Sequence, residues 1–231
     1  MPDLSPITIA FPIFPQVTQL DFTGPAQVLS RMGNTSVKLV AASREPVATD
    51  SGFPVHPTHR LDEVEEATIL CVPGGTGVTA ALEDEAMLAW TRRIAARAEW
   101  VTAVCTGSLL LGAAGLLKGY RATTHWASHH LLEAFGAEPV RERVVFDRNR
   151  ATGGGVTAGI DFGLALVAAI RGEEHARFVQ LTLEYDPQPP FASGSPEQAS
   201  PEVRARYDAL AAKLAPDRDA RVRAAAARLE I

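Results

Sequence analysis

The most informative stretch of the sequence is Trp100-Val101-Thr102-Ala103-Val104-Cys105-Thr106-Gly107-Ser108-Leu109-Leu110-Leu111-Gly112. Apolar and β-branched residues predict a strand that ends at the cysteine, and an apolar helical pattern begins directly after the small residues that follow it. A turn of this kind resembles a nucleophile elbow, in which the side chain is held above the edge of an α/β sheet. The stretch therefore predicts an α/β fold with a functional thiol at one end of the sheet.

The same order of strand and helix recurs on the N-terminal side of this stretch. Short apolar runs at residues 7–11, 37–42 and 68–72 predict three more strands, with helix-length segments between them. Strands that alternate with helices form a mostly parallel sheet with helices on both faces. Residues 46–61 and 144–152 interrupt the pattern, and we expect each of them to form a small antiparallel excursion.

The composition of the chain changes abruptly after Tyr185. Helical patterns occupy residues 83–97, 160–170, about 173–185, 201–214 and 218–229. A Pro-rich segment that begins Asp186-Pro187-Gln188-Pro189-Pro190 separates the last two helices from the others. We therefore expect residues 1–186 to form one catalytic domain and residues 187–231 to form a linker with a helical tail.

The overall composition excludes several classes of protein. With 231 residues, of which 46% are hydrophobic and 21% charged, the chain can bury one sizeable core. A net charge of -5 without any long basic run argues against nucleic acid or an anionic membrane as a partner. The N-terminus does not read as a signal peptide, and the longest apolar stretch, residues 159–170, is too short to span a bilayer. We expect a soluble cytoplasmic protein whose two cysteines remain thiols.

Cys105 is the strongest candidate for a nucleophile. The N-terminus of a helix stabilises a thiolate, so a cysteine at this turn is expected to ionise readily. The alternative is a buried core cysteine, which is the common fate of this residue type. The turn position and Gly107 favour the reactive interpretation, whereas Cys71 lies between Leu70 and Val72 in a strand pattern and is expected to be core.

A glycine-rich turn follows the strand pattern at residues 68–72. In Pro73-Gly74-Gly75-Thr76-Gly77, Gly74 and Gly75 are candidates for backbone N–H donors to a developing negative charge. The alternative is an ordinary glycine turn between a strand and a helix. The turn lacks the Gly-Lys-Ser/Thr of a P-loop, and Gly153-Gly154-Gly155 lacks the context of a dinucleotide site. We expect no cofactor.

Asp21 and His125 carry two further side chains that can transfer protons. Asp21 follows the first strand, at the sheet end where open α/β folds place their sites, so it is a candidate general acid or base. Its alternative role is local capping, because Thr18-x-x-Asp21 resembles a capping box. His125 is expected near Cys105, as a base or as a wall of the pocket. His125 and His129 share a helical face, but the His-Glu-x-x-His pattern is absent, so no metal site is expected.

Four motifs in this order resemble those of the PfpI superfamily. They are Gln19-Leu20-Asp21-Phe22-Thr23-Gly24-Pro25, Val72-Pro73-Gly74-Gly75, Val104-Cys105-Thr106-Gly107 and Ala122-Thr123-Thr124-His125-Trp126. The resemblance spans residues 7 to about 185 and is strongest to the branch of isonitrile hydratases. It implies a flavodoxin-like sandwich and a homodimer.

The resemblance also implies roles for individual residues. The protease branch of the superfamily has His directly after the nucleophilic Cys, whereas this chain has Thr106. Most members carry Glu where this chain has Asp21, and the isonitrile hydratases share the shorter acid. The implied partner is a small-molecule isonitrile. The implied catalytic residues are Cys105, Asp21 and Thr106, and the implied substrate or anion-hole residues are Gly74, Gly75 and His125.

The expected reaction is the addition of water to an isonitrile, which gives an N-substituted formamide. Cys105 would add to the carbon that Asp21 protonates, and water would then release the product; alternatively, Asp21 activates water directly. Two other functions stay open: a ligand-binding or oxidative-stress-sensing module in which Cys105 is oxidised, and glyoxalase-like hydration of 2-oxoaldehydes. The superfamily domain also occurs in AraC-type transcription regulators, but the residues after Asp186 show no helix-turn-helix pattern.

Overall fold

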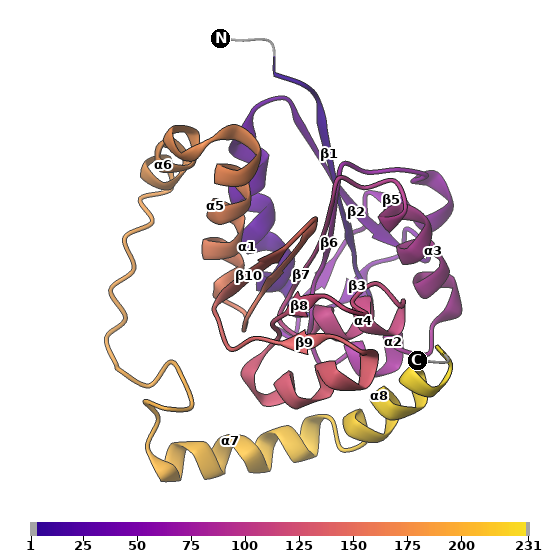
Figure 1. Ribbon diagram of the computed structural model, residues 1–231, viewed down its shortest axis with the longest axis vertical. Coiled ribbons are helices and arrows are strands. Elements are labelled where there is room, and N and C mark those ends of the chain that lie inside the picture. Colours follow the sequence, from indigo (N-terminus) through magenta and orange to yellow (C-terminus); the bar gives the residue numbers. More distant parts are fainter. Residues whose placement is uncertain (1–3, 230–231) are drawn as a thin grey trace.

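The computed structural model describes residues 4–229 and contains a central seven-stranded sheet (Figure 1). The strand order is β10-β11-β7-β6-β1-β2-β5. The strands are β1 (Ile7–Pro12), β2 (Thr35–Ala41), β5 (His59–Arg60), β6 (Ile69–Val72), β7 (Trp100–Val104), β10 (Val144–Asp147) and β11 (Arg150–Gly153). Every neighbouring pair is parallel except β10 and β11. The predicted α/β fold with a mostly parallel sheet is confirmed.

Helices cover both faces of the sheet, with α1 and α5 on one side and α3 and α4 on the other (Figure 1). The helices of this part are α1 (Gln19–Leu29), α2 (Val78–Ala81), α3 (Glu85–Ala95), α4 (Gly107–Ala113), α5 (Ala158–Arg171), α6 (Glu173–Thr182) and the 3-10 turns η1 (Ser30–Met32) and η2 (Leu61–Glu63). The Asp84 side chain caps α3 by accepting the Met87 N–H at 3.0 Å. Among residues 4–229, no helix is long and apolar enough to cross a membrane.

The core lies on both faces of the central strands. All four residues of β6 are buried, and four of the five residues of β7 are buried beside them. Thr102 is the one polar residue of β7, and its hydroxyl donates to the Leu70 carbonyl at 2.8 Å, so no polar group is stranded there. Cys71 is fully buried in β6, as expected for a core cysteine. These strands form a rigid base for the loops at their carboxyl ends.

Both segments that were predicted to interrupt the parallel pattern contain an antiparallel hairpin, but only the second hairpin belongs to the central sheet. The first contains a separate hairpin, β3 (Val47–Ala48) with β4 (Pro54–Val55), in which Val47 faces Val55. The second is a hairpin of β10 and β11 that joins the central sheet, because β11 pairs in parallel with β7. The hairpin at residues 144–153 is therefore part of the main sheet, and the loop after β11 reaches the same sheet end as Cys105.

The segment after α4 corrects one expectation. Residues Trp126–Phe135 form the 3-10 helix η3, flanked by the short strands β8 (Arg121–Ala122) and β9 (Glu138–Pro139). His125 is not in this helix: it is the N-cap, with ψ of 132°, and its Nδ1 accepts the Ala127 N–H at 3.3 Å. His125 and His129 therefore do not share a helical face, because His125 is the N-cap and lies just before the first residue of the helix.

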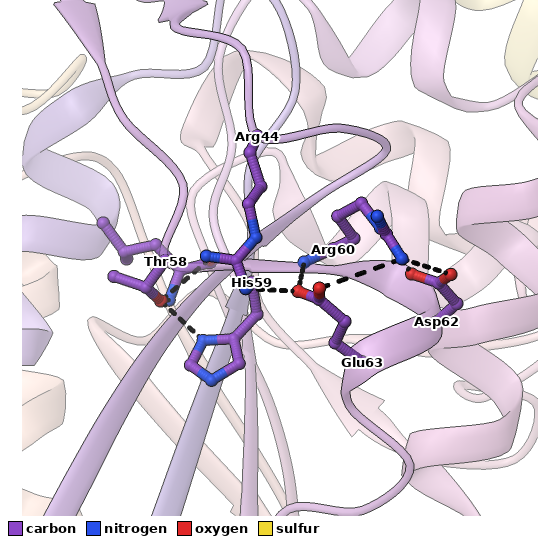
Figure 2. Close-up of polar contacts among 7 residues, drawn as sticks. Arg44, Thr58, His59, Arg60, Asp62 and Glu63 are labelled. Carbon is purple, nitrogen blue, oxygen red and sulfur yellow. Dashed lines mark hydrogen bonds and ion pairs between the residues drawn. The ribbon is translucent and has the colours of Figure 1, made fainter.

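Two groups of polar contacts lie at β5, an edge strand of the sheet (Figure 2). Thr58 contacts His59 at 2.8 Å, and a separate charged cluster joins Arg44, Arg60, Asp62 and Glu63. Arg60 forms two hydrogen bonds of 2.9 Å with Asp62, and Arg44 contacts Glu63 at 2.7 Å. Charged side chains on an edge strand discourage pairing with another chain, so we assign this cluster a structural role.

The C-terminal segment returns to the domain after a long excursion. Residues 183–200, all of which the structure describes, form neither helix nor strand. They are followed by α7 (Pro201–Leu214) and α8 (Arg218–Ala227). Val222 and Ala225 of α8 are buried against the domain, and Arg221 forms an ion pair of 2.9 Å with Glu83. In Figure 1 the two helices, in yellow, run along the end of the domain where α2 and α4 lie.

Candidate active site

Cys105 lies directly after β7 in a strained turn. Its φ is 57°, a left-handed value that costs energy in any residue except glycine and that turns the side chain away from the strand direction. The turn is held on both sides, because the Cys105 N–H donates to the Gly154 carbonyl at 2.8 Å and the Thr124 hydroxyl donates to the Cys105 carbonyl at 2.8 Å. A Cβ at Gly107 would lie 2.1 Å from the Val72 carbonyl oxygen, so only glycine permits this close approach of α4 to β6.

Asp21 lies beside this thiol. The carboxyl group is fully buried, its Oδ2 accepts the Gly74 N–H at 2.9 Å, and its Oδ1 has no hydrogen-bond partner among the described residues. Burial raises the pKa of Asp21 to about 7, against the lowering effects of the Gly74 N–H and the Cys105 thiol; the nearby Asp50 adds to the rise. A carboxyl group with this pKa can both accept and donate a proton near neutral pH.

The Cys105 thiol differs from the expectation of a readily ionised cysteine. Burial, followed by the negative charge of Asp21, raises its pKa well above the usual value. The backbone N–H groups of Thr106 and Val156 act in the opposite direction but do not outweigh these effects. In the resting protein the thiol therefore keeps its proton. Because Asp21 lies beside this protonated thiol and can accept a proton near neutral pH, proton transfer to its carboxylate is the available way to form the nucleophile.

The glycine turn after β6 also differs from expectation. The Gly74 N–H donates to Asp21 and the Gly75 N–H donates to the Thr106 hydroxyl at 3.0 Å, so neither amide is free to bind an anion. A Cβ at Gly74 would lie 2.6 Å from the Thr106 nitrogen and 2.9 Å from Asp21 Oδ2. The two glycines thus allow the backbone to approach the site closely. Thr106 completes this contact, because its hydroxyl also donates to the Gly75 carbonyl at 3.2 Å.

Asp21 has no capping role in the structure. The Thr18 side chain makes no capping bond to α1 and instead donates to the carboxylate of Asp50 in the β3–β4 hairpin. Of the two roles that Thr18-x-x-Asp21 left open, the geometry therefore favours the one in which Asp21 serves Cys105.

The sequence did not predict Val156, whose backbone N–H takes the donor role that was expected of Gly74 and Gly75. The backbone N–H of Val156, in the loop between β11 and α5, lowers the pKa of Cys105, as does the N–H of Thr106. The signal in the sequence was Gly153-Gly154-Gly155, which lets this loop pass close to the thiol. These two N–H groups are the candidate donors to an anion at the sulfur or on an atom bound to it.

His125 forms a wall of the site. A Cβ at Gly155 would lie 3.0 Å from the imidazole Cδ2, which places His125 against the loop that leads to Val156. Burial, followed by the positive charge of Arg218, lowers the pKa of His125 to about 4, so the ring is neutral near pH 7. Of the two roles considered for His125, a neutral wall therefore fits better than a proton-transferring base.

A cavity of about 570 Å³ adjoins this wall. It is lined by Thr124 and Gly154, which hold the Cys105 turn, by their neighbours Thr123 and Gly155, and by residues 194–197 and Arg204 of the C-terminal segment. In the described part of the chain, no cluster of three or more His, Cys, Asp or Glu side chains has the geometry to hold a metal ion.

The chain belongs to the DJ-1/PfpI family, which it matches over residues 7–169. It is 52% identical over 197 residues to the isonitrile hydratase of Pseudomonas putida, covering 85% of this chain and 86% of that protein. A crystal structure of a THiJ/PfpI family protein from Pseudomonas syringae has 43% identity and a TM-score of 0.91, over 97% of this chain and 92% of that one. The HTH-type transcriptional regulator CdhR of Pseudomonas aeruginosa is 31% identical, but only 41% of its length is covered. The family predicted from the four motifs is confirmed.

Proposed function

We propose that this protein is an isonitrile hydratase, which adds water to an isonitrile to give an N-substituted formamide. The observation that carries the proposal is the buried pair of Cys105 and Asp21 at the strand-to-helix turn. The similarity to the isonitrile hydratase of Pseudomonas putida extends over most of both chains and supports the same reaction.

The first chemical step needs a nucleophile and an acid. The terminal carbon of R–N≡C is nucleophilic until it is protonated and electrophilic afterwards. Asp21 removes the thiol proton from Cys105 and delivers it to this carbon, while the sulfur forms a bond to the same carbon. The result is a thioimidate, R–N=CH–S–Cys105, and Asp21 is again a carboxylate. The backbone N–H groups of Thr106 and Val156 lower the pKa of Cys105 and so stabilise negative charge on its sulfur.

The second step uses the same carboxylate as a base. Asp21 takes a proton from water as the water oxygen bonds to the thioimidate carbon, and it passes this proton to the nitrogen, which gives R–NH–CH(OH)–S–Cys105. The carbon–sulfur bond then breaks, the hydroxyl proton moves to the sulfur and R–NH–CHO is released. The free Oδ1 of Asp21 is the atom available for these transfers. A route in which Asp21 activates water without a bond to sulfur uses the same acid and is distinguished by a Cys105 variant.

The proposal is tested with the purified protein and cyclohexyl isocyanide. We expect loss of the isonitrile and stoichiometric appearance of N-cyclohexylformamide, followed by proton NMR. In parallel, methylglyoxal tests glyoxalase-like hydration, and hydrogen peroxide with peptide mass mapping tests a sensor in which Cys105 is oxidised. A folded wild-type protein that produces no formamide would contradict the hydratase assignment, and turnover of methylglyoxal alone would support the glyoxalase-like alternative.

Thr106 supports the site through the backbone of Gly75, and its variants test this role. In Thr106→Val the buried Gly75 N–H loses its acceptor, which is expected to lower the free energy of unfolding by about 1–3 kcal/mol and to reduce kcat/KM. Thr106→Ser keeps the hydroxyl and is expected to restore most of both. Urea unfolding and the formamide assay measure the two effects. A Val variant as stable and active as wild type would remove Thr106 from the site.

We also propose a cytoplasmic homodimer with a catalytic domain at residues 1–186. The cytoplasmic location is supported by the chemistry, because the reaction needs a reduced thiol at Cys105. A dimer is supported by apolar side chains on the surface of α6, where Phe178 and Leu181 are 60% and 79% exposed. Exposed side chains of this kind are typical of a surface that another subunit covers.

A further inference from the structure

The C-terminal segment lies outside the residues that match the family, yet it forms part of the cavity beside the active site. The match ends at residue 169, whereas the cavity of about 570 Å³ is lined by residues 194–197 and by Arg204 of α7. Buried side chains of α8 and a hydrogen bond of 2.7 Å from Arg228 to the Leu82 carbonyl fix the segment on the domain. This part of the cavity wall is therefore added to the common domain of the family.

The cavity shares a wall with the turn that holds Cys105. Thr124, whose hydroxyl donates to the Cys105 carbonyl at 2.8 Å, and Gly154, whose carbonyl accepts the Cys105 N–H at 2.8 Å, both line it. Gly155 continues this wall towards Val156. Because two of these positions are glycines, no side chain from them fills the space next to the turn. An R group on a carbon at the Cys105 sulfur therefore has this cavity beside it.

Two side chains of α7 hold the tail against the cavity. The Tyr207 ring stacks on the His125 ring, with 6.0 Å between centroids and 20° between planes, and its centroid lies 4.6 Å from that of Trp126. The Arg204 guanidinium lies over the Trp126 ring, 4.4 Å from its centroid, and both of these residues line the cavity. A cation over an aromatic face is attracted to it, so these contacts fix the positive charge of Arg204 at the cavity wall.

One arginine of the cavity wall has no ion-pair partner in the described part of the chain. Glu142 pairs with Arg121 at 3.9 Å, and Arg143 pairs with Asp161. Arg141, which lines the cavity beside them, forms no ion pair among residues 4–229. Guanidinium groups bind carboxylates through strong, charge-assisted hydrogen bonds. The cavity therefore offers a guanidinium to an anionic group of a ligand.

The C-terminal segment adds one charge of each sign to the cavity wall. Arg204 contacts Asp208 at 3.4 Å along α7, and Glu197 lines the cavity from the segment before α7. Hydrogen bonds from its own backbone and then from the Ser195 side chain lower the pKa of Glu197, and the positive charges of Arg141 and Arg204 add to this effect. Both arginines that line the cavity therefore lie close enough to act on one carboxylate at its rim.

A buried imidazole contributes a further polar group to the wall. His129 is 9% exposed and lines the cavity, and its Nε2 has no hydrogen-bond partner among the described residues. A buried polar atom without a partner is costly, so a ligand oxygen that accepts its hydrogen bond would be stabilised. Together with Arg141 and Arg204, this imidazole makes the wall richer in donors than an apolar R group requires.

We propose that this cavity binds the R group of the isonitrile and favours R groups that end in a carboxylate, with which Arg141 and Arg204 pair. The inference rests on the proposed function, because that function defines the R group. The tail supplies Arg204, so the preference for an acidic R group is a property that the C-terminal segment adds to the domain. Glu197 opposes this preference, because its negative charge repels the carboxylate.

The test compares acids with their methyl esters, which differ in charge but little in size. The ligands are the formamides that the reaction would produce, ω-formamidobutanoate and ω-formamidohexanoate, and calorimetry measures their binding to the full chain without turnover. We expect wild type to bind at least one acid more tightly than its ester. Arg141→Gln and Arg204→Gln are each expected to lower this ratio of affinities by about fivefold, as for the loss of one partly exposed ion pair, and Glu197→Gln to raise it by a similar factor. Arg97→Gln, at an exposed position after α3 and outside the cavity, is the matched control and is expected to keep the wild-type ratio.

The corresponding isonitriles, ω-isocyanobutanoate and ω-isocyanohexanoate, are expected to give the same preference in kcat/KM, and thermal unfolding shows that each variant is folded. A wild-type ratio of one or less for both chain lengths would overturn the proposal, as would wild-type ratios in both Arg141→Gln and Arg204→Gln. A wild type that prefers the acids but forms no formamide from any isonitrile would support the binding site and contradict the hydratase assignment. Turnover of cyclohexyl isocyanide without any preference for acids would do the reverse, so the two failures are distinguishable.

Discussion

Asp21→Asn is expected to lower kcat/KM for isonitrile hydration by about 10³-fold. Asn has the same shape and its side-chain oxygen can still accept the Gly74 N–H, so the turn stays in place. What is lost is the group that moves the thiol proton to the isonitrile carbon and then takes a proton from water. Both chemical steps depend on that group, and the expected loss lies within the range of about 10²–10⁴-fold for general acid–base catalysis.

The pH dependence of the wild type should report the same carboxyl group. Removal of the thiol proton requires the ionised form of Asp21, whose pKa is raised to about 7. The value of kcat/KM is therefore expected to increase with pH through a midpoint near 7, which reports the ionisation of Asp21. In Asp21→Asn the residual activity should lack this limb.

Because the folded protein raises the pKa of Asp21, its carboxylate also destabilises the fold as pH rises through that value, so the Asn variant is expected to be more stable than wild type above pH 7.

Asp50→Asn is the matched control for charge near the site. Asp50 is exposed, and its negative charge raises the pKa of Asp21 although Asp50 takes no part in the proposed proton transfers. Its replacement should leave kcat/KM nearly unchanged at high pH and move the acidic limb slightly to lower pH. Wild-type activity in Asp21→Asn, or a wild-type profile that is flat across neutral pH, would contradict the role of Asp21.

The sequence predicted most of the fold, because the periodic patterns of apolar residues that indicate strands and helices lie within short stretches of the chain. The strand over Trp100–Val104 and the helix over Pro201–Leu214 have the predicted bounds. Residues 144–152 were predicted to form a small antiparallel excursion, and the structure adds that β11 of this hairpin joins the central sheet. Its pairing with β7 is a contact between distant residues, and no local pattern encodes it.

The candidate site was predicted in outline and differs in its contacts. Cys105 and Thr106 follow β7 and Asp21 follows β1, and these parallel strands, separated only by β6, end at the same side of the sheet. The partners of Gly74 and Gly75 could not be predicted, because a glycine turn does not reveal which side chain its N–H groups will meet. The raised pKa of Cys105 depends on burial beside Asp21, which is a tertiary property.

The contact of Tyr207 with His125 was not predicted for a related reason. In the sequence Tyr207 belongs to Ala- and Arg-rich helices after a Pro-rich linker, and such a pattern indicates an amphipathic tail without indicating where it docks. The packing of Val222 and Ala225 on the domain fixes where this tail lies.

Cys105→Ala is expected to reduce formamide production by about 10⁴-fold or more, to the background rate in buffer. The reason is that, in the proposed reaction, water attacks the isonitrile carbon only after this carbon has bonded to the Cys105 sulfur. Loss of one thiol from the turn should leave the protein folded, because the hydrogen bonds of the turn use the backbone of Cys105. Thermal unfolding of the variant checks this point.

Cys71→Ala is the matched control, because Cys71 is also buried but lies within β6, where burial raises its pKa to about 12. Formamide formation from cyclohexyl isocyanide, followed by proton NMR for wild type, Cys105→Ala and Cys71→Ala, tests whether the Cys105 thiol is the nucleophile. We expect wild type and Cys71→Ala to produce the formamide and Cys105→Ala to produce none above background. Sustained turnover by a folded Cys105→Ala protein would contradict the role of the thiol and would indicate that Asp21 activates water directly.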